Sequence, residues 1–284
     1  MIVITGASGQ LGRLVIQNLL KELPAGELAV TVRNPDKVRD LSTLGIQVRQ
    51  ADYSRPETLA PAFQGAHKLL LISSSEVGQR FSQHRAVIDA ARQAGVGLLA
   101  YTSILHADTS PLALAAEHLE TEGYLKTSGL PYVLLRNGWY TENSTAGIPT
   151  GLQHGVLLGS AGQGRIASAA RADYALAAAS VLLKKDQAGR SYELAGDAAY
   201  TLAELAAEIS RQCGKAIAYQ NLPEAEYQAV LLGAGLPEGL ATLLAQSDTG
   251  ASKGGLFDDS HSLSQLIGRP TTPLSALVAE ALKA

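Results

Sequence analysis

Short apolar runs alternate with longer amphipathic segments through the first half of the chain. This alternation is typical of βαβ units, in which buried parallel strands are joined by helices that pack on the sheet. The expected strands are residues 2–5, 28–32, 46–49, 69–72, 98–102 and 132–135. The pattern therefore predicts the α/β fold class, with a doubly wound parallel sheet.

The first amphipathic segment predicts a helix that packs on this sheet. Leu11, Val15 and Leu19 recur at four-residue spacing with Leu14 alongside, which places apolar side chains on one helix face. Asn18 interrupts this face but leaves it largely apolar.

The rhythm becomes less regular beyond about Tyr140, where glycine-rich turns at residues 159–164 precede an alanine-rich helix expected at residues 173–184. This change predicts two domains. Residues 1–140 form the first, and residues 141–284 form a smaller C-terminal α/β lobe, from which some segments return to the first domain.

Two further segments of the second half carry local signals. Thr201 and Glu204 have the spacing of a capping box, which predicts a helix that runs to about Gln212. Residues 250–262 are rich in Gly, Ser and Asp without a clear period, so we expect a loop, with Phe257 as a candidate contact to an aromatic ligand. Its G-x-S-x-G spelling lacks the flanking strand and helix of a nucleophile elbow, so hydrolase chemistry is not expected.

The charge and cysteine content limit the classes of partner. The formal net charge of −3 and the absence of a Lys or Arg cluster argue against nucleic acid. Cys213 is the only cysteine, so neither an intrachain disulfide nor a thiolate metal site is expected, and the histidine spacing predicts no metal. The chain shows no signal peptide and no apolar run long enough for a membrane span, which together with the lone cysteine favours a cytoplasmic location.

A glycine turn joins the first expected strand to the first expected helix. Gly6 suits the tight turn, Gly9 allows close approach of a diphosphate, and Gly12 permits close contact between helix and sheet. Free N–H groups at the helix start then attract the anion. In this context the turn predicts a Rossmann-type dinucleotide site, and the alternative is a glycine turn without a ligand. The expected cofactor-binding residues here are Gly6, Ala7, Ser8, Gly9, Gln10, Leu11 and Gly12.

The end of the second strand indicates which dinucleotide binds. NAD-preferring sites usually carry an acidic residue there, whereas this chain has Arg33, whose guanidinium suits a 2′-phosphate. We therefore expect NADP(H), the alternative being an exposed arginine at a strand end. Asp52, after the third strand, is equally consistent with a bond to the adenine amino group and with a simple turn or helix cap.

Six stretches distributed along essentially the whole chain carry a family resemblance: residues 5–12, 33–35, 50–53, 71–78, 136–140 and 252–259. They resemble the NmrA-like group of atypical short-chain dehydrogenases, and within it the bacterial NADPH-dependent quinone oxidoreductases. The first two stretches are features of the superfamily, and the last three are more specific. Triphenylmethane-dye reductases are similar over the same length but match less well around Ser73 and Gly250.

The resemblance implies further site residues at the carboxyl ends of the strands, where ligands bind in open α/β sheets. A loop of three serines would lie beside the nicotinamide. A segment after the sixth strand would line the crevice that holds the nicotinamide and the substrate. One arginine is a weaker candidate for the same crevice. Local capping of a polar loop and ordinary packing of the aromatic residues are the alternatives. These residues are Ser73, Ser74, Ser75, Asn137, Gly138, Trp139, Tyr140, Asn143 and Arg171.

The Tyr-x-x-x-Lys pair of typical short-chain dehydrogenases is absent. In its place are His118 and Glu122, which share a helix face and form either a proton relay or, as we favour, a structural pair. A quinone becomes an aromatic hydroquinone monoanion and needs less acid catalysis than a ketone, so direct hydride transfer by proximity would suffice.

The resemblance thus implies an NADPH-dependent enzyme that reduces a small-molecule quinone. Assembly of the enzyme into a homo-oligomer is possible. Two alternatives remain. A redox sensor of the NmrA type would bind NADP without turnover, and a reductase of triphenylmethane dyes would use the same cofactor on a cationic acceptor.

Overall fold

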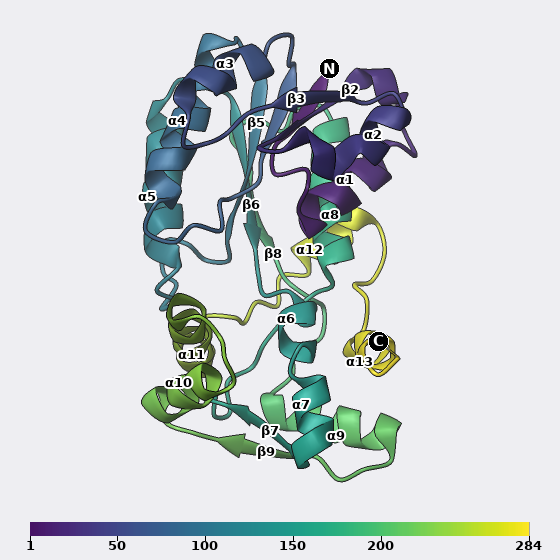
Figure 1. Ribbon diagram of the computed structural model, residues 1–284, viewed down its shortest axis with the longest axis vertical. Helices are drawn as coiled ribbons and strands as arrows, with labels where there is room; N and C mark the ends of the chain where they lie inside the picture. Colours follow the sequence, from purple (N-terminus) through teal and green to yellow (C-terminus); the bar gives the residue numbers. More distant parts are fainter. Residues whose placement is uncertain (284) are drawn as a thin grey trace. The chain divides into compact units, whose positions relative to one another are not determined.

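The computed structural model describes residues 1–283, which form two compact units (Figure 1). The first unit contains residues 1–107, 116–137 and 171–192. The second contains residues 108–115, 138–170 and the described residues from 193 onward. Residues 171–192 therefore return to the first unit after an excursion of the chain into the second.

A seven-stranded sheet forms the centre of the first unit, in the order β3-β2-β1-β4-β5-β6-β8. Every pairing from β3 to β6 is parallel. The strand order reverses between β1 and β4, which is where ligands bind in doubly wound sheets. The expected fold class is confirmed. The strands are β1 (Ile2–Ile4), β2 (Leu28–Val32), β3 (Gln47–Gln50), β4 (Lys68–Leu71), β5 (Leu98–Ile104), β6 (Tyr132–Asn137) and β8 (Ser191–Leu194).

The strands agree with the apolar runs because β1, β2 and β5 are buried along their whole length, and β4 and β6 are buried in all but their first residue. All residues of β2 and β5 are buried, as expected for strands covered on both faces. β5 and β6 extend two residues beyond the expected ends, to Ile104 and Asn137. The β5 extension begins with the polar Ser103, and the β6 extension consists of Arg136 and Asn137, so the apolar pattern was interrupted before the strands ended.

Helices cover the sheet on both faces (Figure 1). α1 and α8 pack side by side, and α4 packs on α3 and contacts β4. α1 buries Leu11, Val15 and Leu19 as expected, together with Ile16, whereas Leu14 is only half-buried. The helices are α1 (Gln10–Leu19), α2 (Arg39–Thr43), α3 (Leu59–Ala62), α4 (Arg80–Gln93), α5 (Ala115–Thr127) and α8 (Arg171–Leu183), with 3-10 turns η1 (Ala25–Glu27), η2 (Pro35–Val38) and η3 (Pro56–Thr58).

The second unit contains a two-stranded parallel sheet, β7 (Val156–Gly159) with β9 (Ala218–Asn221). The capping box is confirmed, because Glu204 N donates to Thr201 Oγ1 and Thr201 N donates to the Glu204 carboxylate. The helices are α6 (Thr141–Thr145), α7 (Ile148–His154), α9 (Leu202–Cys213), α10 (Glu224–Gly233), α11 (Glu238–Ser252), α12 (Ser262–Ile267) and α13 (Leu274–Ala281).

The expected loop at residues 250–262 is wrong at both ends. Residues 250–252 form the last turn of α11, and Ser262 begins α12. Gly250 lies directly against the side chain of Leu112, where a Cβ atom would collide, so this glycine serves close packing of a helix rather than a flexible turn. A helix therefore precedes Ser252, which excludes the strand-turn-helix of a nucleophile elbow.

Two other classes of feature are absent from the described part of the chain. Within residues 1–283, no helix combines the length and apolarity that a bilayer crossing requires. The same residues contain no cluster of three or more His, Cys, Asp or Glu side chains that could hold a metal ion.

Candidate dinucleotide site

The turn between β1 and α1 requires two of its glycines. Gly6 has φ +60°, and a Cβ atom there would lie 3.3 Å from Cβ of Ile72. At Gly12 a Cβ atom would lie 2.6 Å from the carbonyl oxygen of Gly6 and 2.9 Å from Cα of Ala7. Gly12 therefore allows the helix to pack on the turn itself, rather than on the sheet as the sequence suggested.

The start of α1 has a positive electrostatic character that favours an anion. The helix begins at Gln10, its N-cap Gly9 contributes no side-chain bond, and its first turn has no acidic residue. The first N–H groups of a helix have no intrahelical acceptors and carry the positive end of its dipole. Gly9 and Gln10 are exposed, whereas Ala7 and Leu11 are buried and offer only backbone to a ligand. Free N–H groups at an exposed helix start are the groups that hold a diphosphate in dinucleotide sites.

A buried hydroxyl holds the two strands at the reversal point together. Thr5 Oγ1 donates to the Leu70 carbonyl at 2.9 Å and accepts from Ile72 N at 3.1 Å. Tyr53 OH bonds to the same Thr5 oxygen and donates to the Ile72 carbonyl at 3.0 Å. Burial raises the pKa of Tyr53, so it stays neutral. Sequence reasoning gave no role to Thr5 or Tyr53, although both lie in stretches that carry the family resemblance.

Arg33 follows β2 and is exposed, at 69% of its side chain. Its Nη1 atom lies 3.0 Å from Oε1 of Glu76. The Asp52 carboxylate accepts from Ser54 N at 3.0 Å, which is a local turn bond. This bond engages one carboxylate oxygen, and the expected bond to the adenine amino group stays a prediction.

The serine loop, Ser73 to Ser75, follows β4, and three buried or half-buried side chains form hydrogen bonds with its backbone. Ser73 N donates to Thr102 Oγ1 at 2.9 Å, and Ser74 N donates to Nε2 of His84 at 2.9 Å. Arg80 Nε donates to the Ser74 carbonyl at 2.6 Å. These bonds occupy the N–H groups of Ser73 and Ser74 and the carbonyl of Ser74.

Two buried histidines lie beneath this loop. His84 Nδ1 is 3.0 Å from Thr121 Oγ1, and His118 Nδ1 is 2.7 Å from the hydroxyl of Tyr101. Burial, and then the charge of Arg80, lower the pKa of each histidine to about 3. Both are therefore neutral at physiological pH.

Glu122 has a different set of partners. Its fully buried carboxylate accepts from Arg136 at 2.9 and 2.7 Å and from Ser103 Oγ at 2.6 Å. His118 and Glu122 share α5, as the sequence indicated, but each is engaged with separate groups.

Asn137 ends β6 and is only 7% exposed. Its Oδ1 atom is buried and has no hydrogen-bond partner among residues 1–283. A buried carbonyl oxygen without a donor costs free energy unless a ligand supplies one. An amide N–H₂ group, such as that of a nicotinamide carboxamide, fits this requirement.

The remaining expected residues fall in different units. Gly138, Trp139, Tyr140 and Asn143 belong to the second, where Gly138 N donates to the Leu194 carbonyl at 2.8 Å. Trp139 and Tyr140 are half-buried and Asn143 is exposed. Arg171 begins α8 in the first unit.

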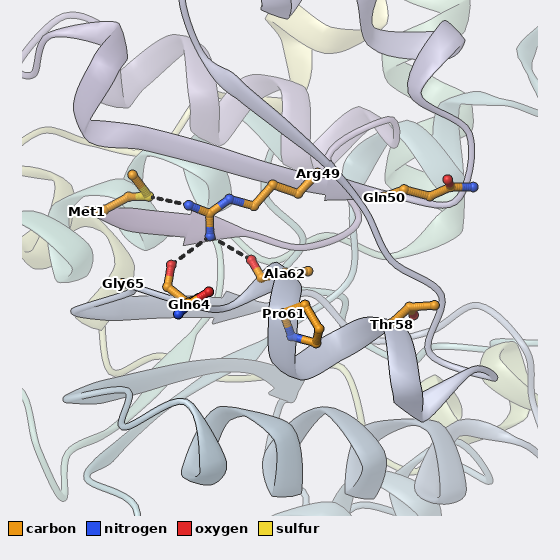
Figure 2. Close-up of a pocket in the computed structure, with 8 residues that line it drawn as sticks. All are labelled: Met1, Arg49, Gln50, Thr58, Pro61, Ala62, Gln64 and Gly65. Carbon is orange, nitrogen blue, oxygen red and sulfur yellow. Dashed lines mark hydrogen bonds between the residues drawn. The ribbon is translucent and has the colours of Figure 1, made fainter.

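Figure 2 shows a surface pocket at the edge strand β3. The guanidinium of Arg49 donates to the carbonyls of Ala62 and Gln64 at 2.8 and 2.9 Å and contacts Sδ of Met1 at 3.2 Å. The arginine thus ties β3 to the chain after α3 and to the N-terminus.

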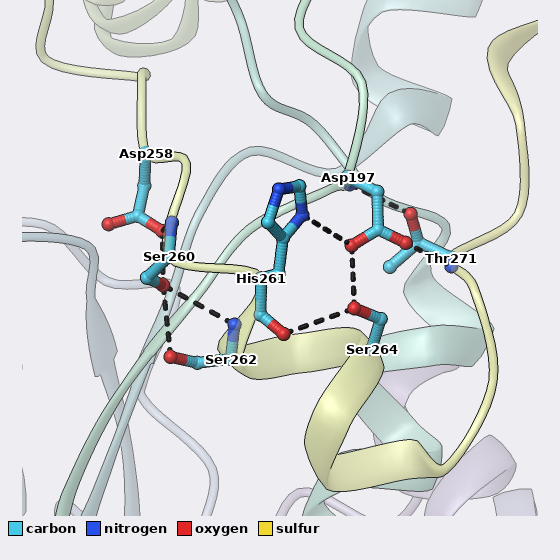
Figure 3. Close-up of polar contacts among 7 residues, drawn as sticks. All are labelled: Asp197, Asp258, Ser260, His261, Ser262, Ser264 and Thr271. Atoms are coloured by element: carbon cyan, nitrogen blue, oxygen red, sulfur yellow. Dashed lines mark hydrogen bonds and ion pairs between the residues drawn. The ribbon is translucent and has the colours of Figure 1, made fainter.

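Figure 3 shows a Ser, His and Asp group in the second unit that is not a nucleophilic triad. His261 Nδ1 lies 3.0 Å from Asp197 Oδ1, but Ser264 Oγ donates to the same carboxylate at 2.6 Å instead of to the imidazole. Asp197 also accepts from Thr271 N at 2.8 Å. The cluster therefore fixes the start of α12 to the segment after β8.

The sequence from Gly6 onward matches a protein-family model described as NAD(P)H-binding, over residues 6–185. The chain belongs to this NAD(P)H-binding family. The expected nicotinamide dinucleotide and the expected family are confirmed.

Relatives of known structure extend the match beyond the family model. The chain is 60% identical over 278 residues to quinone oxidoreductase 2 of Escherichia coli K12, covering 98% of this chain and 97% of that protein. The crystal structure of the NADPH-dependent quinone oxidoreductase from E. coli complexed with NADPH gives a TM-score of 0.98, covering 99% of this chain and 100% of that one. The triphenylmethane reductase of Citrobacter sp. with NADP(H) is 39% identical with a TM-score of 0.96, covering 99% and 100%.

Proposed function

We propose that this chain is an NADPH-dependent quinone oxidoreductase that transfers a hydride directly from NADPH to a quinone. The observation that carries the proposal is the 60% identity, over nearly the full length of both chains, to quinone oxidoreductase 2 of E. coli. The glycine turn and the exposed Arg33 supply the groups that such a cofactor needs.

Each part of the cofactor has a matching group in the first unit. The N–H groups at the start of α1 bind the diphosphate, and Arg33 binds the 2′-phosphate. Asn137 Oδ1 accepts from the carboxamide and orients the nicotinamide. Ser73, Ser74 and Ser75 lie beside that ring. When bound, NADPH supplies the hydride.

The chain positions the reactants rather than supplying a strong acid. We assign His118 and Glu122 structural roles, because His118 is a neutral, buried partner of Tyr101 and Glu122 is paired with Arg136. The hydroquinone monoanion is stabilised by its own aromatic ring, so proximity carries most of the rate enhancement. We place Gly138, Trp139, Tyr140, Asn143 and, more weakly, Arg171 around the nicotinamide and the quinone.

Steady-state oxidation of NADPH with a panel of benzoquinones and naphthoquinones tests the proposal. We expect turnover with several quinones and a marked preference for NADPH over NADH. Tight binding of oxidised and reduced cofactor without turnover on any quinone would contradict it and favour a redox sensor. Faster turnover of cationic triphenylmethane dyes than of every quinone would instead favour a dye reductase.

Three further statements belong to the proposal. The reaction takes place in the cytoplasm, which the lone free Cys213 supports because it forms no disulfide within the chain. Nucleic acid is not a partner, since the net charge is −3. Assembly into a homo-oligomer is part of the proposal, and light scattering of the purified chain tests it.

A further inference from the structure

Glu76 lies at the end of the serine loop and bonds to three different groups. Its Oε1 atom is 3.0 Å from Nη1 of Arg33, and its Oε2 atom accepts from Gln83 Nε2 at 2.8 Å. Its backbone N–H donates to Ser74 Oγ at 3.1 Å. The carboxylate is thus held in one place, beside the arginine assigned to the 2′-phosphate.

From this geometry we propose that Glu76 is a specificity-determining residue, which lowers the preference for NADPH over NADH by neutralising Arg33. The inference rests on the proposed function, since it requires Arg33 to bind the 2′-phosphate. The Glu76 carboxylate is an anion on the same guanidinium that a phosphate would use.

The charges decide the direction of the effect. Arg33 presents its guanidinium to an incoming 2′-phosphate with one nitrogen already engaged by a carboxylate, and that carboxylate also repels the phosphate. NADH has a 2′-hydroxyl in place of the phosphate and carries no charge there. Glu76 therefore weakens the binding of NADPH selectively.

Gln83 allows the carboxylate to be removed without loss of packing. Its side chain is buried, with 5% of the residue exposed, and its Oε1 atom has no hydrogen-bond partner in the described part of the chain. In Glu76→Gln the new amide can donate to this oxygen after the Gln83 amide rotates, while the carbonyl of the new amide still accepts from Arg33. Gln83 Nε2 also donates to Ser54 Oγ at 3.0 Å, and after the rotation Ser54 becomes the donor to Gln83 Oε1. The variant therefore removes the charge while residue 76 keeps both of its side-chain partners.

A matched control comes from a second exposed pair. Arg55 Nε lies 3.0 Å from Glu57 Oε1, with side chains 64% and 65% exposed, against 69% and 45% for Arg33 and Glu76. Glu57→Gln removes the same charge from a pair of the same length that involves neither Arg33 nor the serine loop.

Calorimetric titration with NADPH and NADH tests the proposal on the wild type, Glu76→Gln, Glu57→Gln, Arg33→Ala and Arg33→Ala/Glu76→Gln. We expect Glu76→Gln to bind NADPH about two- to fivefold more tightly at low salt, the range of exposed charge pairs, with NADH unchanged. The gain shrinks as salt is added, and it is smaller in the Arg33→Ala background. Glu76→Ala should shift NADPH affinity in the same direction, and thermal melting verifies that each variant is folded.

Other outcomes separate this inference from the proposed function. Unchanged or weaker NADPH binding by folded Glu76→Gln would overturn the inference, and so would an equal gain in Glu57→Gln. An NADH affinity that rises as much as the NADPH affinity would also overturn it. A wild-type chain that binds neither dinucleotide would instead refute the proposed function.

Discussion

His84 holds the backbone of Ser74, because its Nε2 atom accepts the Ser74 N–H at 2.9 Å. The bond requires that Nε2 carry no proton. Burial favours that state by lowering the pKa of His84 to about 3. The serine loop, which we place beside the nicotinamide, is therefore supported by a histidine that must remain neutral.

The buried histidines make stability depend on pH. In the unfolded chain a histidine titrates near 6.5, whereas His84 and His118 titrate near 3 when folded. Their contribution is fully present above pH 6.5 and is lost as pH falls toward 3. Each adds at most about 1.4 kcal/mol per pH unit. Urea unfolding of the wild type and of His84→Gln between pH 7.5 and 4.5 measures how the unfolding free energy falls with pH. This fall should be smaller in the variant, and an equal fall in both proteins would contradict the low pKa of His84.

Asp248 changes the pH dependence of stability in the opposite direction, because its contribution is lost as pH rises. Burial raises the pKa of its carboxyl from 3.8 to about 6, although Ser160 N donates to Oδ2 at 2.8 Å. The contribution of this group to stability is present at low pH and is lost as pH rises through about 6. Asp248→Asn should therefore stabilise the chain at pH 7.5 by about 1 to 3 kcal/mol, a gain that vanishes near pH 4. A gain of the same size at both pH values would refute this account.

Gly12→Ala tests the packing of the glycine turn. The added Cβ would lie 2.6 Å from the Gly6 carbonyl oxygen, so the turn must move and the diphosphate site with it. We expect a loss of about 1 to 3 kcal/mol in unfolding free energy and at least about tenfold weaker NADPH binding. Gly26→Ala is the control, because a Cβ at Gly26 meets no described atom within 4 Å. Wild-type NADPH affinity in folded Gly12→Ala would count against the role of the turn.

Glu122→Gln separates a structural role from proton transfer. The change leaves Arg136 buried without its carboxylate, which should cost about 3 to 5 kcal/mol in unfolding free energy. The kcat of the folded fraction and its pH profile should stay close to those of the wild type. Glu120→Gln, at an exposed position of the same helix, should change neither quantity. A large fall in kcat with unchanged stability would restore Glu122 as a catalytic candidate.

The sequence predicted the sheet well because parallel strands buried on both faces leave a direct apolar signal. β2 was expected at residues 28–32 and begins and ends there. The same signal missed the last two residues of β5 and of β6, where Ser103, Arg136 and Asn137 interrupt the apolar pattern. It also indicated a loop at Gly250, since composition cannot distinguish a glycine that packs against Leu112 from one in a turn.

The candidate site could be proposed from the sequence where it depends on local backbone geometry. The turn at Gly6 and the arginine after β2 both follow from sequence position. The bonds that hold the serine loop could not be predicted from the sequence, because His84 and Arg80 reach Ser74 only after α4 folds back on β4. Glu76 stood out in the sequence only as part of a motif, and its bond to Arg33 spans 43 positions.

Calorimetric titration of the wild-type chain with NADPH and with NADH tests the central claim most directly. We predict saturable binding of one NADPH per chain, and markedly weaker binding of NADH because that dinucleotide offers Arg33 no 2′-phosphate. The absence of heat and of saturation with NADPH would contradict the entire account.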